Sequence, residues 1–164
     1  MAREPIEQSS GAIAADQADP AMPWFEHQVR VHPQQTDYAG VVWHGAYVGW
    51  LEEARLEALE AVGIPYGAIV AAGCDLPVVT LNLHYHVPLR LGEVAVVRSR
   101  PTETRGVRWR WQQRIESRDR QVQYLSAELT LTPVDRATGR VMRRPPAPVQ
   151  DLLHRLQRFG ETSA

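Results

Sequence analysis

The hydrophobic and polar positions of the chain first follow a regular pattern in the stretch FEHQVRVHP, which begins at Phe25. Every second residue falls on the same face, and this period of two residues predicts a β-strand that Pro33 ends. One face holds Phe25, His27, Val29 and Val31, and the other holds Glu26, Gln28, Arg30 and His32.

The pattern then changes to steps of three and four residues, the period of an amphipathic helix. Gly63 suits the position that follows the last helical turn, and Pro65 cannot continue a helix. We therefore predict one helix of about 18 residues, roughly 27 Å long, which would be the longest in the protein. Its apolar stripe consists of Tyr47, Leu51, Ala54, Ala58 and Val62, with Glu52, Glu53, Glu57 and Glu60 off the stripe.

Four further stretches have the period of strands: PVVTLNLHYHVPL, GEVAVVRSR, GVRWRWQQRIE and QVQYLSAELTLTPV. We expect them to form a meander whose last two strands are joined by a turn at 117–120. The proline-rich stretch RRPPAPV then leads to a short helix around 150–158. In the third of these strands, one face holds Val107, Trp109, Trp111, Gln113 and Ile115.

The sequence therefore predicts an α+β fold, with a sheet of about five antiparallel strands that buries the stripe of one long helix. The other face of the sheet still carries apolar side chains, and its edges are open. Because association through an edge strand would cover both, we expect an oligomer.

Composition narrows the class of protein. Of the 164 residues, 44% are hydrophobic and 23% charged, and the net charge of -1 favours neither nucleic acid nor an anionic membrane. No apolar run approaches the ~18 residues of a membrane span. All 18 basic residues are arginine, so anions would be bound by guanidinium groups. Cys74 is the only cysteine, which excludes a disulfide within the chain and fits a cytoplasmic protein.

We expect residues 1–22 to be a flexible tail without a targeting signal, because they lack an apolar run of signal-peptide length. Residues 23–145 would form the main domain, and residues 146–164 a C-terminal helix and tail.

The stretch TDYAGVVWHGAY, residues 36–47, places an acid, a glycine, apolar residues and a histidine directly before the long helix. One interpretation is a helix entry with an acidic residue near the positive end of the helix dipole. The other is a catalytic carboxylate, Asp37, which faces the anion site formed by the unpaired amides of a helix N-terminus.

This stretch resembles the hotdog-fold thioesterases of the 4-hydroxybenzoyl-CoA type. The form with His44-Gly45, where aryl-CoA members carry Tyr-Pro, looks more like the Tol–Pal-associated acyl-CoA thioesterases. The order of elements extends the resemblance over about 25–132, and the motif itself covers 37–55. The matching positions are Asp37, Ala39-Gly40, Val41-Val42, Trp43, His44 and Gly45-Ala46-Tyr47.

The resemblance implies a hotdog fold, in which the sheet wraps around the central helix, and hydrolysis of an acyl-CoA or aryl-CoA thioester. It also implies a homodimer or a tetramer of dimers. The acyl group and the pathway stay open. No metal or cofactor is expected, since coenzyme A is part of the substrate.

Within this family, catalysis would fall on Asp37 and His44. Asp37 would attack the thioester carbonyl or activate water, and the backbone amide near His44 would polarise the carbonyl. The His44 imidazole could contact the substrate, orient Asp37 or only occupy the helix start. Substrate contacts would fall on Gly40, Val41, Trp43, Tyr47, Arg105 and Arg108, with Arg90 and the pair Arg143–Arg144 as further candidates for the coenzyme A phosphates.

Two further groups of residues are considered for other functions, and neither indicates one. His84 and His86 share a strand face, but no carboxylate or cysteine joins them at a metal-binding spacing, so we expect surface or interface residues. Trp109 and Trp111 are expected in the core or a subunit interface.

Two alternatives on the same fold stay open. One is a non-catalytic acyl-CoA-binding protein, although a carboxylate without a role beside an apolar pocket would be costly. The other is a hydratase or dehydratase, whose acid–histidine pair would be more closely spaced than Asp37 and His44.

Overall fold

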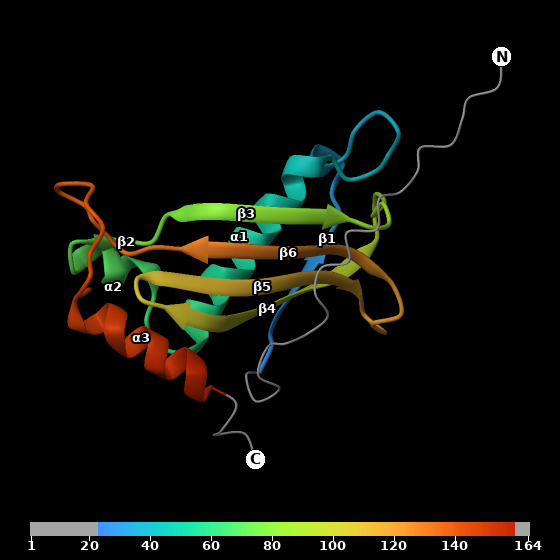
Figure 1. The fold of residues 1–164 in the computed structure, drawn as a ribbon. Coiled ribbons are helices and arrows are strands. Elements are labelled where there is room, and N and C mark those ends of the chain that lie inside the picture. The colour runs from blue at the N-terminus through green and yellow to red at the C-terminus, as the bar shows by residue number, and fades with distance from the viewer. Residues whose placement is uncertain (1–22, 160–164) are drawn as a thin grey trace.

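The computed structural model describes residues 23–159 (Figure 1). A five-stranded antiparallel sheet covers one long helix, α1, and two shorter helices complete the same layer. The elements are β1 (Phe25–Arg30), a 3-10 turn (Pro33–Gln35), α1 (His44–Ala61), α2 (Tyr66–Ala71), β2 (Cys74–Asp75), β3 (Val78–Tyr85), β4 (Val94–Arg105), β5 (Arg108–Ser117), β6 (Gln123–Leu131), β7 (Val134–Asp135) and α3 (Ala147–Arg158). The tail predicted over residues 1–22 lies outside the described residues.

The strand order β1-β4-β5-β6-β3 confirms five antiparallel strands but shows that the predicted meander is wrong for its first strand. β4, β5 and β6 follow one another, whereas β3 pairs with β6 and not with β4. The segment between β3 and β4 is instead held by the loop before α1. The Val42 amide donates to Leu89 O over 2.8 Å, and Val41 forms a β-bridge with Arg90. These contacts prevent a tight β3–β4 hairpin.

α1 confirms the predicted helix of 18 residues. Its backbone lies nearest to β1 and β4, and its buried side chains also pack against residues of β5 and β6 in the two core clusters. After the C-cap residue Val62, Gly63 adopts φ 74° and donates its amide to Glu60 O, as expected for a C-terminal glycine. The stripe buries Tyr47, Leu51, Ala54 and Ala58 as predicted, together with Trp50 and Leu59.

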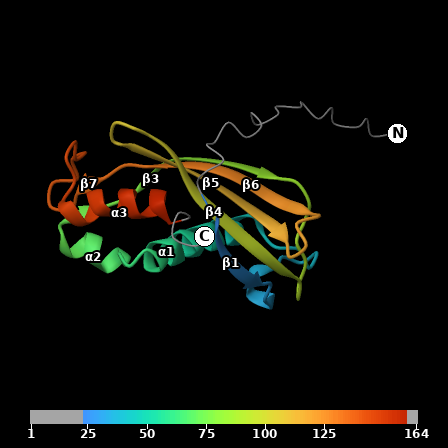
Figure 2. The same ribbon diagram turned by 90° about the horizontal axis from the view of Figure 1, so that it is seen from below.

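α3 is longer than predicted, because it begins at Ala147 and not near residue 150. Proline is tolerated in the first helical turn, where an amide has no intrahelical partner, and Pro148 lies there. Figure 2 shows α3 beside α1 and α2 on one side of the sheet. Its buried residues Val149, Leu152 and Leu156 join one core cluster with Trp109 and Trp111 of β5, which confirms the core placement of both tryptophans.

Two short features had no counterpart in the sequence pattern. α2 has six residues, and β2 pairs with β7 over two residues only, so neither is long enough to show a period. Cys74 is the first residue of β2, and its side chain is a buried free thiol. Among the described residues, no helix is both long and apolar enough to cross a membrane.

Candidate active site

The loop before α1 folds back on itself and brings Asp37 towards the helix start. Thr36 forms a β-bridge with Val42, and the Asp37 amide donates to Val41 O over 2.9 Å. Gly40, with φ 70°, closes the turn by donating to Asp37 O over 3.0 Å. A side chain at this position would be strained by the backbone conformation, so the geometry favours glycine. The loop therefore places Asp37 opposite the residues that lead into His44.

The Asp37 carboxylate is exposed and held by its own loop. Its Oδ1 accepts hydrogen bonds from the amides of Ala39, at 2.8 Å, and Val41, at 3.4 Å. Within the part of the chain that the structure describes, Oδ2 has no hydrogen-bond partner. One oxygen thus orients the carboxylate while the other stays open for chemistry.

The N-terminus of α1 offers free backbone donors. Trp43 is the N-cap residue, no side chain caps the helix, and the first turn contains no acidic residue. Trp43 N donates to Gln35 O, and Ala46 N donates to Trp43 O. The intervening amides, those of His44 and Gly45, have no acceptor among residues 23–159. The positive end of the helix dipole adds to these donors, so this end of α1 can stabilise an oxyanion.

Trp43 and Gly45 are matched in shape at this helix start. A Cβ on Gly45 would overlap the six-membered ring of Trp43, which is 45% exposed. The His44 imidazole is exposed and meets the Trp43 ring edge-on, with ring centroids 5.4 Å apart. The indole ring therefore packs directly against the Gly45 backbone.

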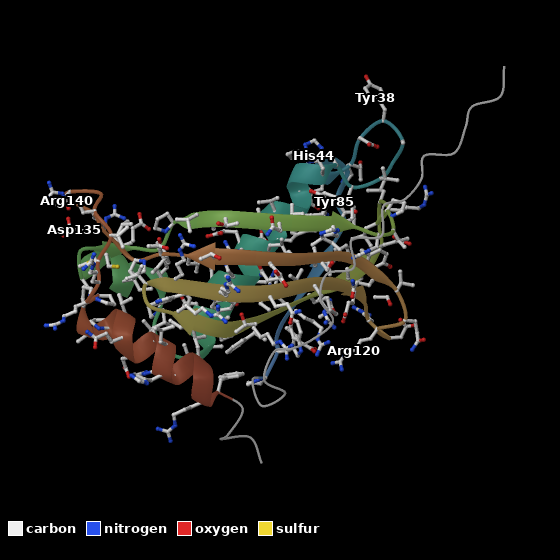
Figure 3. All side chains as sticks on the ribbon, viewed as in Figure 1. Tyr38, His44, Tyr85, Arg120, Asp135 and Arg140 are labelled. Carbon is white, nitrogen blue, oxygen red and sulfur yellow. The ribbon has the colours of Figure 1, made fainter. Side chains whose placement is uncertain are left out.

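Tyr85, at the end of β3, is a site residue that the sequence did not reveal. Its hydroxyl donates to His44 O over 3.1 Å, and its ring meets that of Tyr47 with centroids 5.5 Å apart. In Figure 3, Tyr85 lies next to His44, whereas Tyr38 points away from both at the tip of the loop. Partial burial raises the pKa of Tyr85, so the phenol stays protonated as a donor.

Tyr47 is buried and supports the site from behind. Its hydroxyl accepts a hydrogen bond from the Leu89 amide over 3.1 Å, and desolvation raises its pKa. The predicted contact residues Gly40, Val41, Trp43 and Tyr47 thus all belong to the loop and helix start, although Tyr47 faces the core and not the solvent.

The structure does not bring Arg105 and Arg108 to this place within one chain. They face each other at the β4–β5 hairpin. Tyr85, which contacts His44, is aligned through β6 with Ile115 of β5. Arg108 precedes Ile115 by seven residues on β5, so it lies about 23 Å further along the sheet.

Arg90 is the candidate arginine next to the site loop, because it forms the β-bridge with Val41. Its side chain is exposed, and its amide donates to the Glu93 carboxylate over 2.7 Å. Arg143 and Arg144 are exposed in the segment between β7 and α3.

A buried polar network fixes α1 to the sheet behind the site. Arg55, in α1, donates to Gln113 Oε1 over 3.0 Å and to Leu51 O over 3.2 Å, and it is paired with Glu52. Gln113 is fully buried in β5 and donates to Leu51 O and Ser99 Oγ. A glutamine on the apolar face of a predicted strand was the one sequence signal of this network.

His84 and His86 are exposed on β3 and just after it. His86 Nε2 lies 2.8 Å from Ser126 Oγ and 3.0 Å from Gln123 Nε2. Among the residues that the structure describes, no group of three or more His, Cys, Asp or Glu could hold a metal ion.

The chain belongs to the thioesterase-like superfamily, which it matches over residues 31–156. It is 46% identical to the Synechocystis protein sll0410, which has only a provisional name as an esterase, over 82% of this chain and 81% of that protein. It is 33% identical to the acyl-CoA thioester hydrolase YbgC of Escherichia coli O6:H1, over 56% of this chain and 68% of that protein.

The fold of the chain is also similar to that of solved thioesterases. The crystal structure of the DHNA-CoA thioesterase from Staphylococcus aureus superposes with a TM-score of 0.75 at 20% identity, over 86% of this chain and 95% of that one. The predicted family, hotdog fold and thioesterase class are therefore confirmed.

Proposed function

We propose that this chain hydrolyses the thioester bond of an acyl-coenzyme A at the N-terminus of α1. The observation that carries the proposal is the pair of free backbone amides, at His44 and Gly45, beside a loop that leaves Asp37 Oδ2 open. Coenzyme A as the carrier is supported by the name of the Escherichia coli relative, an acyl-CoA thioester hydrolase.

The proposed reaction uses the two parts in sequence. Asp37 Oδ2 attacks the carbonyl carbon, or it takes a proton from a water molecule that attacks instead. The carbonyl π electrons move to oxygen, and the amides of His44 and Gly45 donate to the resulting oxyanion. The C–S bond then breaks, and the coenzyme A thiolate takes up a proton. In the covalent route a water molecule then hydrolyses the mixed anhydride, which releases the acid and restores Asp37. Neither route needs a metal ion.

The coenzyme A phosphates call for guanidinium groups near this entry. Within one subunit Arg90 supports this role best, because it is bridged to the site loop. Arg105 and Arg108 would contribute only from a neighbouring subunit, since they lie at the other end of the sheet.

We also propose that two copies associate through β3. This strand ends the sheet, and its side away from β6 has no partner among the described strands. Near its two ends it exposes apolar side chains, since Val79 is 53% and Tyr85 49% exposed. A second copy that adds its own β3 in antiparallel fashion would cover both features. Light scattering should give the mass of a dimer or its multiple, and Val79→Lys should lower the mass. A monomeric wild type would contradict this arrangement.

The catalytic proposal is tested by thiol release from a panel of acyl- and aryl-CoA esters. Asp37→Asn keeps an oxygen for the loop hydrogen bonds but removes the charge, so we expect an intact fold and a loss of at least about a hundredfold in kcat, or some 2.7 kcal/mol. Asp37→Ala should lose as much.

Asp135→Asn is the matched control, because Asp135 Oδ1 also accepts from a turn amide, that of Thr138, but lies far from the site. It should retain full activity. If no ester is hydrolysed while acyl-CoA still binds, the chain is an acyl-CoA-binding protein. If the Asp37 variants match wild type, the carboxylate only shapes the loop. A cytoplasmic location stays a prediction.

A further inference from the structure

Tyr85 ends β3 beside the start of α1, and its hydroxyl group contacts the peptide group that carries one of the two proposed oxyanion donors. The hydroxyl donates to His44 O over 3.1 Å. His44 O and the Gly45 amide belong to the same planar peptide group. We infer that Tyr85 is a positioning residue for thioester hydrolysis, which fixes and polarises this peptide group so that the Gly45 amide donates more strongly to the oxyanion. The inference rests on the proposed function.

The peptide groups of both free amides have donors on their carbonyl oxygens. The His44 amide shares its peptide group with Trp43 O, which accepts from the Ala46 amide over 3.0 Å. The Gly45 amide shares its peptide group with His44 O, which accepts from Tyr85. A hydrogen bond to a carbonyl oxygen draws electrons from the amide nitrogen, so the N–H of the same peptide group becomes a stronger donor. The first of these donors is backbone, whereas the second can be removed by substitution of Tyr85.

The geometry of the helix leaves room for Tyr85 as a second donor to His44 O. In an α-helix this carbonyl faces the amide four residues later, that of Val48. A carbonyl oxygen has two lone pairs, so it can accept from Tyr85 at the same time. His44 is the first residue of α1, and Figure 3 shows it beside Tyr85. The hydroxyl therefore adds to the helical hydrogen bond and does not replace it.

The ring of Tyr85 is held in place although the residue is 49% exposed. It meets the ring of Tyr47 with centroids 5.5 Å apart, and the hydroxyl of Tyr47 is itself fixed by the Leu89 amide. Phenylalanine would keep these ring contacts. Within the described part of the chain, the Tyr85 hydroxyl has no hydrogen-bond partner other than His44 O. The O–H group is thus the part of Tyr85 that acts on the peptide group.

Two general magnitudes set the size of the effect. The loss of one oxyanion donor lowers kcat by about 10²–10³-fold. A neighbouring hydrogen bond strengthens another by about 10–30%. If the bond from the Gly45 amide weakens by that share of its free energy, kcat falls by about two- to eightfold. KM should stay within about twofold, because the oxyanion forms in the transition state and not in the bound ester.

The first experiment compares Tyr85→Phe with wild type on the CoA ester that wild type hydrolyses fastest. We expect kcat to fall by about two- to eightfold and KM to stay within about twofold. Tyr38→Phe is the matched control, because Tyr38 loses the same hydroxyl group from an exposed residue that points away from the site. It should leave both constants unchanged. Urea denaturation should show that both variants are fully folded under the conditions of the assay.

An infrared measurement separates polarisation from a purely structural role. The probes are isotope-labelled analogues of butyryl- and benzoyl-CoA in which a methylene group replaces the thioester sulfur, so they bind but cannot be hydrolysed. The oxyanion donors should lower the stretching frequency of the bound carbonyl. Because one of two donors becomes about 10–30% weaker, this shift should be about 5–15% smaller in Tyr85→Phe. Tyr38→Phe should show the wild-type shift.

The outcomes separate this inference from the proposed function. A lower kcat together with a smaller carbonyl shift would support the inference. Equal kcat values of wild type and Tyr85→Phe, or a lower kcat with an unchanged shift, would overturn it and leave thioester hydrolysis standing. A change in KM alone would also overturn it, since Tyr85 would then contact the ground-state substrate.

If wild type hydrolyses no ester, the proposed function fails, and the carbonyl shift alone decides. A smaller shift in Tyr85→Phe than in Tyr38→Phe would support a polarised peptide group. Equal shifts, or no shift of the probe with wild type, would overturn it.

Discussion

Gln113 is the centre of the polar network that joins α1 to the sheet, and its replacement by leucine tests how that network stabilises the protein. Its Oε1 accepts from Arg55 at 3.0 Å, and its Nε2 donates to Leu51 O at 2.8 Å and to Ser99 Oγ at 2.5 Å. Gln113 and Ser99 are both fully buried. Leucine has a similar size, so the substitution removes three hydrogen bonds and leaves little empty space.

The structure sets the magnitude of the effect. Arg55 is 7% exposed and would lose an acceptor for a buried charged donor, which costs about 1.5–3 kcal/mol. The Ser99 hydroxyl would lose its donor, and each neutral bond contributes about 1 kcal/mol. The added apolar surface of leucine offsets about 1 kcal/mol. We therefore expect Gln113→Leu to lower the free energy of unfolding by about 3 kcal/mol, a large part of the ~5–15 kcal/mol of a typical domain.

A double-mutant cycle measures the coupling between Arg55 and Gln113. Arg55→Met alone should also destabilise, because it leaves Gln113 Oε1 without its donor. With both changes the charge and its acceptor disappear together, and Glu52, whose side chain is 54% exposed, is solvated by water. The double variant should therefore be more stable than the sum of the single losses by about 1–3 kcal/mol.

Urea denaturation followed by circular dichroism measures all four proteins, with comparable m-values as the check on two-state unfolding. A loss under about 1 kcal/mol in Gln113→Leu, or strict additivity in the cycle, would refute a coupled network.

Two further predictions concern stability. Leu152→Ala should lower the free energy of unfolding in urea by about 2–5 kcal/mol, because the Leu152 side chain is fully buried where α3 packs on the core. A loss under about 1 kcal/mol would show that α3 is detached in solution. Burial raises the pKa of Tyr47, Tyr66 and Tyr124 above 10.0 in the folded protein. The stability that these protonated phenols contribute is therefore complete below the pKa of the unfolded state, and it is lost as pH rises through the pKa values of the folded state. Stability should thus fall above pH 10, together with the appearance of phenolate absorbance. Desolvation lowers the pKa of Arg55 to about 10, and this shift acts in the opposite direction above that pH. The stability of Arg55→Met should therefore fall more steeply with pH than that of wild type.

The sequence by itself determined the elements whose pattern is long enough to be periodic. α1 follows from its stripe, and β1, β5 and β6 follow from alternation, because these periods reflect which face meets the core. The resemblance of 36–47 to a thioesterase motif also placed the candidate site at the start of α1, since the motif is local and the helix follows it directly.

Only the tertiary structure decided what depends on contacts between distant segments. β3 pairs with β6 because the segment after it is tied to the loop before α1 by Leu89 and Val42, and no local pattern encodes that tie. Tyr85 reaches His44 through this strand order, and the register of β3, β6 and β5 places Arg108 at the other end of the sheet. The hydrophobic period of a segment indicates which face of that one helix or strand is buried. A site formed by several elements depends on how these elements are arranged in space.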